Sequence, residues 1–434
     1  MEQMINESLK IHTVIPLAHV NHFQIQWEIN EHALLHLDGE MSYEEAVACQ
    51  SGSISGSSIE IRYQDSRQEH VLFHGLVRKT EFLWDGGVPR LRLEAVSATW
   101  KLDQRRTSRS FQDQEMTYAQ LVRQIADDSG AGAVISCGTE SRLNGALIQY
   151  RETDWEFLKR ISSHLHQFLV CDVETGRPAF WFGMRRGERV TIASDRREES
   201  RFNPLSGRSG CIIRSREVYN LCDRSIWMGV PAAVSGRTAE FQGGDLLFTY
   251  YLDTEIPFSR ETQYNEQFTG RGFYGKVREV SGEMVRVQLD MDGEKESPLY
   301  WYPWRPDTGN IMYAMPETGS TVLLTMPSHD EREGEVRICL HKDSQGKEYQ
   351  NRCLNIRDDS ILRLYPDRLE LSKSGDEHVL AIEDGTGIRL ETGSSLRMEA
   401  SENIICRGNV VDVKAADEIS GVVGQETTKN GVHG

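Results

Sequence analysis

The stretch of residues 380–424 is a short repeat, LAIEDGTG, IRLETGSS, LRMEASEN, IICRGNV, VDVKAADE and ISGVVG. Each block begins with an apolar residue, and these residues follow one another at spacings of 8, 8, 8, 7 and 8. Glycine falls between the blocks, beside Asp, Asn, Ser or Glu, so each block predicts a very short strand and a turn. The side chains predicted to face inward are Leu380, Ile382, Ile388, Leu390, Leu396, Met398, Ile404, Val411, Val413 and Ile419.

A strand of three or four residues with two inward side chains cannot bury its own apolar face. Stacked repeats bury it only against neighbours, and one chain coiling around an axis usually uses about 20 residues per turn. Eight residues are too few for that, whereas three chains with eight residues each are enough. We therefore expect an intertwined triple-stranded β-helix made by three copies of the chain. The alternative is an irregular β-meander packed on the rest of the molecule.

The composition is that of a soluble protein with several domains. The 434 residues allow roughly two to four domains. The net charge of −17, from 49 basic and 66 acidic residues, disfavours nucleic-acid binding, because such binding neutralises phosphates with Lys and Arg. We find no apolar run of about eighteen residues and no secretory signal pattern at the N-terminus, so we expect no membrane span and no export by that route.

Eight cysteines are scattered along the chain without a CxxC motif. This pattern predicts reduced, mostly buried thiols in a protein made in the cytoplasm, and it does not indicate a metal cluster. The cysteines are Cys49, Cys137, Cys171, Cys211, Cys222, Cys339, Cys353 and Cys406.

Residues 11–100 are rich in alternating and β-branched segments separated by Gly, Asp or Pro, so they predict a β-domain that ends near Trp100. Gly75 stands inside one predicted strand, which suggests a bulge or a bend. Residues 117–128, TYAQLVRQIADD, predict an amphipathic helix with Thr117 as its N-cap and Gly130 just past its end.

A second helix is predicted in QYRETDWEFLKRI, where Thr153 and Glu156 form a capping box. Its apolar stripe contains Phe157, Leu158, Ile161, Leu165 and Phe168, and we expect Lys159 and Arg160 to face away from it. A hairpin around Thr175–Gly176 follows. The pairs Asp154 with Glu156 and His164 with His166 are two residues apart, so each points to different helix faces and favours a structural role over catalysis.

The run QYRETDWEFLKRI, followed by a hairpin ending in FWFG, resembles the hub segment of VgrG-type spike proteins of contractile injection systems. These are related to the hub and central spike of bacteriophage T4 and to phage late-control-D proteins. The residues that match the family pattern are Tyr150, Glu152, Asp154, Trp155, Phe157, Leu158 and Arg160.

Residues 269–342 contain short strands whose spacing fits a five-stranded OB-like barrel. The piece MPETGSTVLLTM with its acidic turn also resembles the OB-fold collar of VgrG proteins. Such barrels can stack nucleotide bases on aromatic rings, and Tyr300, Trp301, Tyr302 and Trp304 are candidates. Only Arg305 is basic nearby and the neighbouring loops are acidic, so we expect core or interface residues and no nucleic acid.

The resemblance implies a mainly β fold with a hub of small β-barrels and a few helices, an OB-fold collar and a needle. The predicted parts are a hub at 1–258, a linker at 259–268, the barrel at 269–342, a connector at 343–360, the needle at 361–424 and a flexible tail at 425–434. In the needle we expect Leu362/Leu364 and Leu369/Leu371 to form an irregular first turn. The connector is too short to hold a folded enzyme module.

The resemblance also implies function: a structural, non-enzymatic homotrimer without cofactors. Its hub would sit on the inner tube protein and baseplate proteins, and its needle would be driven through the target membrane with transient contact. A PAAR-type tip protein would cap the blunt end near Val422 to Gly424, and effector cargo is a further expected partner. The protein would be made and assembled in the bacterial cytoplasm and delivered outward at the tip of the particle.

Other classes remain open at this stage. A peptidoglycan-degrading tail hub would need paired carboxylates or a Cys/His nucleophile pair, and no segment offers either in context. A carbohydrate-binding β-protein is a third class. A metal site is conceivable in two places, a tripod of His433 from three chains at the tip and the histidine-rich N-terminal strands. The N-terminal histidines are His12, His19, His22, His32, His36, His70 and His74.

Overall fold

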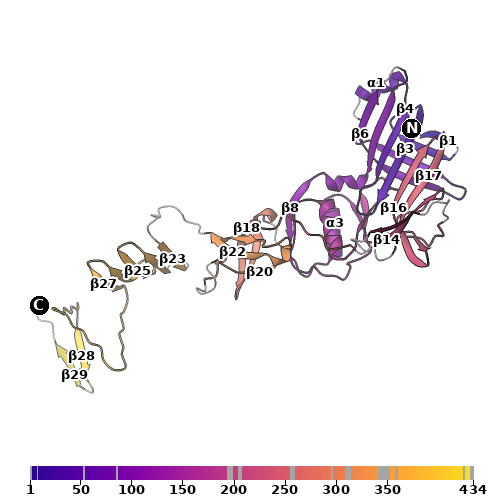
Figure 1. Cartoon of the computed structure of the whole chain (residues 1–434). Coiled ribbons are helices and arrows are strands. Elements are labelled where there is room, and N and C mark those ends of the chain that lie inside the picture. The colour runs from indigo at the N-terminus through magenta and orange to yellow at the C-terminus, as the bar shows by residue number, and fades with distance from the viewer. Residues whose placement is uncertain are drawn as a thin grey trace. The chain divides into compact units, whose positions relative to one another are not determined.

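The computed structural model describes residues 2–6, 8–51, 54–84, 87–192, 199–203, 208–254, 260–294, 297–307, 314–340, 352–356, 360–423 and 426–430. The chain divides into two compact units, Met1–Lys342 and Asp343–Gly434 (Figure 1). The first unit holds a large sheet, a helical insert and a small barrel. The second holds a single sheet and a C-terminal hairpin, β28 (Ile419–Val423) with β29 (Glu426–Asn430).

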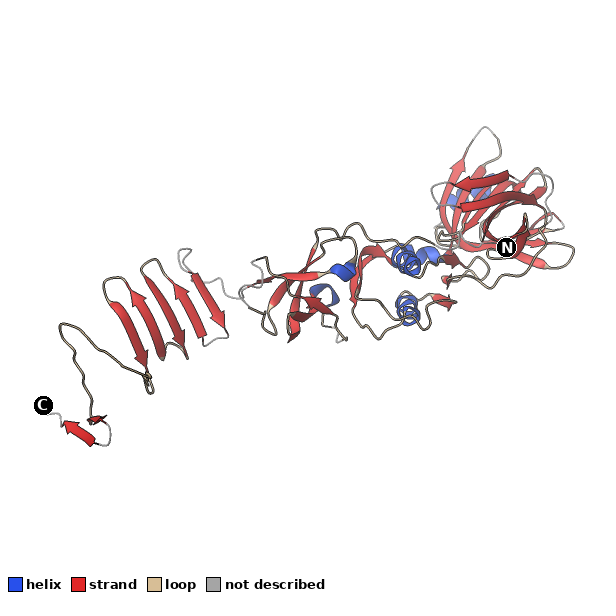
Figure 2. Cartoon of the chain, turned by 60° about the horizontal axis from the view of Figure 1, so that its bottom comes forward, coloured by secondary structure: helices blue, strands red, loops and turns tan. Residues whose placement is uncertain are grey.

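The large sheet has twelve strands in the order β1-β2-β5-β6-β7-β4-β3-β16-β17-β14-β13, with β15 paired to β16. Figure 2 shows its strands curled around the N-terminal region. Strands from both ends of the hub share it, because β3 is antiparallel to β16 and Trp27 lies opposite Arg237. The strands are β1 (Glu2–Asn6), β2 (Leu9–Thr13), β3 (His19–Glu28), β4 (Leu34–Glu40), β5 (Ser58–Gln64), β6 (Glu69–Leu83), β7 (Arg90–Ser97), β13 (Glu199–Asn203), β14 (Arg208–Ser215), β15 (Arg224–Trp227), β16 (Val230–Gln242) and β17 (Asp245–Thr254).

Buried apolar residues alternate with more exposed residues along these strands, and the buried ones form the core. In β3 the buried residues are Phe23, Ile25 and Trp27. The expectation that the β-domain ends near Trp100 is wrong, because the sheet resumes with the strands after residue 198. Gly75 is regularly paired, and the bulges of β6 lie on either side of it. A Cβ at Gly75 would come within 2.4 Å of the Val96 carbonyl oxygen, so close approach of the backbone explains this glycine.

The helical insert lies between the two runs of sheet strands. The predicted helix ends are confirmed: Thr117 caps α2 (Tyr118–Asp128) and Thr153 caps α3 (Asp154–His164), each in a capping box. The predicted hairpin is also present, formed by β11 and β12. The other elements of this part are η1 (Ala98–Asp103), β8 (Arg106–Phe111), β9 (Gly132–Ile135), β10 (Leu147–Thr153), β11 (Leu169–Cys171) and β12 (Ala179–Phe182), and the sequence did not predict α1 (Tyr43–Ser51) earlier in the chain.

The small barrel has five strands in the order β20-β19-β18-β21-β22. A parallel bridge between Trp304 and Val336 joins the two ends of that order, and the Arg305 N–H donates to the Val336 carbonyl oxygen at 2.8 Å. This closed connectivity is that of an OB-fold, as predicted. The sequence also predicts a strand of this barrel in NIMYAMP, residues 310–316, of which 310–313 lie outside the described residues. The elements are β18 (Gly272–Ser281), β19 (Met284–Leu289), η3 (Asp290–Asp292), β20 (Trp301–Pro303), β21 (Thr321–Thr325), η4 (Glu331–Glu333) and β22 (Glu335–Leu340).

The second unit is built on a five-stranded antiparallel meander (Figure 2). Its strands are longer than the three or four residues that the repeat predicted. The leucine pairs at 362/364 and 369/371 do not form an irregular turn but sit in regular register with the strands that follow. The strands are β23 (Arg352–Ile356), β24 (Ser360–Leu364), β25 (Arg368–Lys373), β26 (His378–Glu383) and β27 (Gly387–Thr392).

Candidate functional site: a buried arginine junction and an apolar sheet face

A buried arginine joins the hub to the barrel. Arg160 of α3 is 3% exposed, and its Nε and Nη2 donate to both carboxylate oxygens of Glu152 at 2.8 and 2.9 Å. Its Nη1 donates to Glu331 Oε1 at 2.6 Å, and Nη2 also donates to the Ile148 carbonyl oxygen at 2.8 Å. Glu331 begins η4 of the barrel, so one guanidinium connects elements 171 positions apart in sequence.

At this junction two buried carboxylates share a single buried guanidinium. Glu331 is 1% exposed, and its Oε2 has no hydrogen-bond partner among the described residues. Burial disfavours the charged form of Arg160, but Glu331 and then Glu152 outweigh this and raise its pKa. Because one cation faces two carboxylates, removing the cation would leave two buried acids unpaired.

The other residues of the hub motif support the same junction. Tyr150 packs edge-to-face on Phe273 of the barrel with ring centroids 5.0 Å apart. Ala146 and Ile148 belong to the buried barrel core, so the hub segment is built into the barrel itself. On the hub side, the Trp155 Nε1 donates to the Asn30 carbonyl oxygen at 3.2 Å. The motif is therefore a connection between two folded parts.

The remaining motif residues are divided between core and polar network. Phe157 and Leu158 are fully buried, as the predicted stripe requires. Asp154 accepts from Arg109 Nη2 at 2.9 Å, from Gln149 at 2.9 Å and from Ser129 at 2.6 Å. The expectation that Arg160 faces away from the core was wrong, because Glu152 and Glu331 satisfy its charge inside the protein.

The second candidate site is one face of the meander. Leucines lie opposite one another across the strands, with Leu362 paired to Leu371, Leu371 to Leu380 and Leu380 to Leu390. A second row on the same face pairs Leu364 with Leu369, Leu369 with Ile382 and Ile382 with Ile388. Leu354 extends the first row opposite Leu362.

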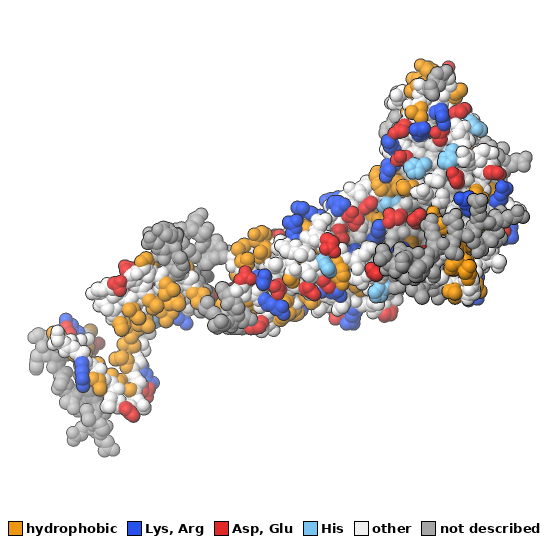
Figure 3. All heavy atoms as spheres, in the orientation of Figure 1, with side chains coloured by type: hydrophobic (Ala, Val, Ile, Leu, Met, Phe, Trp, Pro, Cys, Tyr) orange, Lys and Arg blue, Asp and Glu red, His pale blue; other side chains and the backbone are white. Residues whose placement is uncertain are grey.

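This apolar face is exposed in the single chain. Leu380 is 37% exposed and Ile388 is 75% exposed, and Figure 3 shows hydrophobic side chains gathered over this sheet. Contiguous exposed apolar surface of this kind marks an interaction site. The sequence predicted the residues from 380 onward, and the same two-residue spacing in β24 and β25 would have identified the earlier leucines as part of the same face.

The opposite face of the meander is already satisfied within the chain. Val379 and Ala381 are buried there, together with Glu370 and Ser372. Arg363 Nη1 donates to Glu370 at 2.6 Å, to Ser372 at 2.8 Å and to Asp376 at 2.9 Å. The two faces therefore differ. On one face the side chains are buried or hydrogen-bonded to one another, and on the other the apolar side chains are largely exposed to solvent.

The chain does not bring the later predicted residues together. All residues from 393 to 418 are exposed and none lies in a strand. The apolar side chains of this tail are therefore exposed in the single chain. The predicted residues concerned are Leu396, Met398, Ile404, Val411 and Val413, while Ile419 begins β28 and its side chain lies outside the described part.

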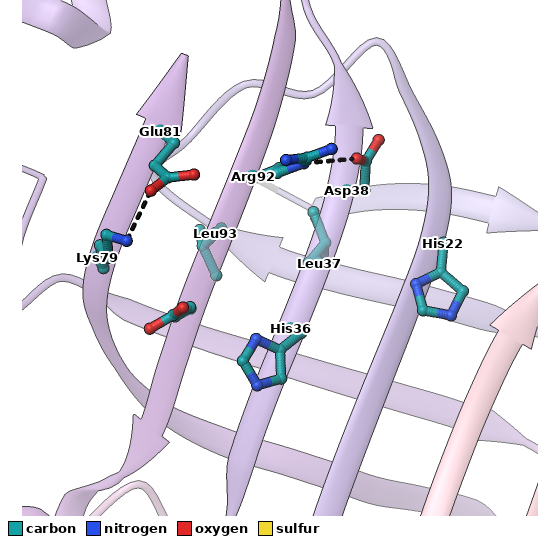
Figure 4. Close-up of a pocket in the computed structure, with 9 residues that line it drawn as sticks. His22, His36, Leu37, Asp38, Lys79, Glu81, Arg92 and Leu93 are labelled. Carbon is teal, nitrogen blue, oxygen red and sulfur yellow. Dashed lines mark hydrogen bonds and ion pairs between the residues drawn. The ribbon is translucent and has the colours of Figure 1, made fainter. Parts of the chain in front are cut away.

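A pocket on the outer face of the large sheet is lined by two of the N-terminal histidines, His22 and His36. Figure 4 shows His22 and His36 on neighbouring strands with Asp38, Lys79 and Glu81 around them. No group of three His, Cys, Asp or Glu side chains suited to a metal occurs in the part of the chain that the structure describes.

The carboxylates of this pocket are held as ion pairs. Arg90 and Arg92 approach Asp38 at 2.8 and 3.5 Å, and Lys79 approaches Glu81 at 2.6 Å. Burial raises the pKa of Asp38, but the hydrogen bonds and charges of its partners lower it overall. The hydrogen bond and charge of Lys79 lower the pKa of Glu81. A general acid needs a raised pKa, so this geometry does not favour acid catalysis.

The barrel aromatics are mainly core residues. Tyr302 is fully buried and Trp304 nearly so, so neither ring can stack a base. Trp301 is covered by Arg286, whose guanidinium carbon lies 4.5 Å from the ring centroid. The expectation that Arg305 is the only basic residue nearby was therefore wrong.

The cysteines are less buried than predicted. Cys171, Cys211 and Cys222 are buried, whereas Cys339, Cys353 and Cys406 are exposed, and all eight are free thiols. The three exposed cysteines lie on the barrel (Cys339) and in the second unit (Cys353 and Cys406). His433 and, within the predicted connector, residues 343–351 and 357–359 lie outside the described residues.

These observations define a class of architecture: a curled hub sheet joined through a buried arginine to an OB-fold barrel, with an apolar meander in a second unit. Residues 35–165 match the family model described as phage tail baseplate hub (GPD). A search of curated proteins returned no match. Among the described residues, none of the helices has the length and apolarity to cross a membrane.

Solved structures share this fold. The c3393 protein of E. coli is described as a component of the type VI secretion system that resembles the T4 tail proteins gp27 and gp5. It aligns at 12% identity with a TM-score of 0.54, over 76% of this chain and 99% of that one. A chain of the half-lidded Francisella PdpA–VgrG complex aligns at 9% identity with a TM-score of 0.57, over 86% and 83%. The chain therefore has the fold of VgrG-type spike proteins, which confirms the resemblance.

Proposed function

We propose that this protein is the structural hub and spike of a contractile injection machine, and that three copies assemble through the apolar face of the meander. The exposed rows of leucine and isoleucine carry this proposal. Fully burying one such side chain contributes about 1.5–3 kcal/mol, so a partner over this face would add substantial stability. A second copy is the natural occupant, because its own rows present the same chemistry and spacing.

The number three rests on the repeat in the tail. A closed turn of a stacked β-structure uses about 20 residues or more, and one chain supplies eight per step. Three chains winding around one axis, with eight residues from each, would complete such a turn and would bury the apolar side chains that residues 393–418 expose. The inward side chains of this needle would be those of the repeat from Leu380 to Ile419.

In the assembled machine the hub would contact the inner tube protein and baseplate proteins, and the needle would puncture the target membrane. The needle end would expose strand edges and apolar core, so a separate PAAR-type cap fits it better than a metal held by His433. Effector cargo is a further proposed partner, and the structurally similar Francisella chain comes from a complex of VgrG with another protein, PdpA. The protein would be made in the bacterial cytoplasm and delivered outward.

The role proposed here is not enzymatic. The buried carboxylates of the junction are committed to Arg160, and those of the outer pocket are paired with Arg90, Arg92 and Lys79. The alternative, a tail hub that degrades peptidoglycan, predicts clearing of a cell-wall suspension by purified protein. We expect no clearing of the suspension. Clearing that is lost when a single acidic residue is replaced would establish the alternative.

A deletion experiment tests the main proposal. Cells that lack the chain should assemble no complete sheath-and-tube particles under electron microscopy, and the wild-type chain should restore them. A chain carrying Leu380→Asp should fail to restore them, whereas Thr386→Asp, which adds the same charge in the exposed turn after β26, should succeed. Intact particles in the deleted cells would refute the role.

A further inference from the structure

Strand β9 of the hub has a free edge. It pairs only with β12 among the described strands, and the order of its sheet is β11-β12-β9. An edge strand presents unpaired main-chain groups, and proteins usually cover or blunt such an edge. Strand β9 is instead built of small and apolar residues, Gly132, Ala133, Val134 and Ile135.

The unpaired groups can be identified from the register. The Gly132 N–H donates to the Pro178 carbonyl oxygen at 2.9 Å, and the Ser136 N–H donates to the Phe182 carbonyl oxygen at 3.0 Å. Alternate residues of a strand point their N–H and C=O to opposite sides, so Ala133 and Ile135 point away from β12. These two residues offer about four main-chain hydrogen bonds to a further strand.

A trough borders β9 and the neighbouring strand. It is lined by Gly132–Val134 of β9 and by the start of β12, including Ala179 and Trp181. Val134, which lies opposite Trp181 in the register, is 55% exposed. A Cβ on Gly132 would meet only Ala179 Cβ, at 3.5 Å, so the backbone here is open to approach.

The turn between β11 and β12 forms the charged rim of the trough. Glu174 is paired with Arg185 at 2.7 Å, and the Asp172 carboxylate accepts the N–H groups of Glu174 and Thr175. Arg177 is exposed, and its guanidinium makes no ion pair with any described residue. The acidic groups of the rim are thus occupied, and the charge offered to a partner is positive.

We propose that β9 is a docking edge for an extended peptide segment of another protein, which adds to the sheet as a strand next to β9. Only a polypeptide backbone complements the groups of Ala133 and Ile135, so the occupant is a strand. An apolar side chain would lie over Val134 and Trp181, and an acidic side chain would pair with Arg177. This proposal stands on the hub alone and does not depend on the trimer.

A selection experiment with full-length protein tests this. A display library of peptides of about ten residues should yield sequences with alternating apolar residues and an acidic residue at a fixed position. A selected peptide, synthesised with capped ends, should lose affinity at least about tenfold when N-methyl groups block its main chain. Absence of enrichment, or equal binding of the N-methylated peptide, would overturn the proposal.

Variants of the edge locate the binding. Ala133→Pro removes an outward N–H that makes no bond to β12, and it should weaken the selected peptide at least about tenfold, whereas Ala133→Ser should leave it unchanged. Val134→Asp changes an exposed side chain and should weaken binding similarly without affecting the fold. Arg177→Glu should weaken it several-fold and Arg177→Lys much less. If the peptide binds the Val134→Asp protein as well as wild type, β9 is not its site.

Discussion

The two units of this protein bury their apolar residues in different ways. In Met1–Lys342, two clusters of buried side chains fill the curled sheet and the barrel, and even charged groups such as Arg160 are enclosed. In Asp343–Gly434, Val379 and Ala381 are the buried apolar residues among those described, while the leucine rows lie at the surface. The first unit thus encloses large apolar clusters within one chain, whereas the second exposes most of its described apolar side chains.

The two units also differ in the length of their strands. Strands in the first unit run up to 15 residues and curl far enough to face other strands of the same chain. Strands of the meander have five or six residues and form one layer, and its apolar face is largely exposed among the residues that the structure describes. We expect such a layer to take a partner layer from another copy.

The largest expected effect is on the meander. Leu380→Asp would place a carboxylate in each copy at the centre of the apolar rows, and each buried charge costs several kcal/mol. We expect the assembly to dissociate into single chains in sedimentation experiments, while the unfolding of the first unit stays unchanged. Thr386→Asp, in an exposed turn, is the matched control and should leave the mass unchanged.

A smaller but still large effect is expected in the first unit at Arg160. Arg160→Met leaves Glu152 and Glu331 buried without a cation and should destabilise this unit by about 3–5 kcal/mol in denaturant unfolding. Adding Glu152→Gln and Glu331→Gln should recover much of the loss. Lys159→Met is the matched control, because its ion pair with Glu31, whose side chain is 62% exposed, lies at the surface and is worth about 0–1 kcal/mol. Equal effects of the two single variants would mean that the junction is not a buried ion network.

Acid should weaken the first unit through His164. Burial, followed by the charge of Arg160, lowers the pKa of His164 to about 4, below the value near 6.5 of an unfolded chain. The unfolded state therefore takes up the proton first, so stability is present above about pH 6.5 and is lost as the pH falls toward 4, by about 3 kcal/mol. His164→Gln should flatten this part of the pH profile relative to wild type. An unchanged slope would show that His164 titrates normally.

The smallest expected effect concerns a helix cap. Thr117→Ala removes the side chain that accepts from the Gln120 N–H and should cost about 1 kcal/mol. The exposed Arg123→Ala in the same helix should cost less, and neither variant should change the mass of the assembly. Thermal unfolding measured at two protein concentrations separates this local effect from one on assembly.

Local signals predicted the parts of the fold that depend on neighbours in sequence. The N-cap at Thr117, the capping box at Thr153, the alternation in β3 and the leucine spacing of the tail are all local. The role of Arg160 was missed because its second carboxylate, Glu331, is far away in sequence. The continuous hub sheet was missed for the same reason, since β3 pairs with β16. Helix α1 has Ala46 as its buried apolar residue and therefore lacks an apolar stripe.

The mass of the full-length protein in solution tests the central claim most directly. Light scattering at micromolar concentration should give three times the 49.4 kDa of one chain. The same measurement on Leu380→Asp should give the mass of one chain. A wild-type protein that stays at the mass of one chain across this concentration range would contradict the account.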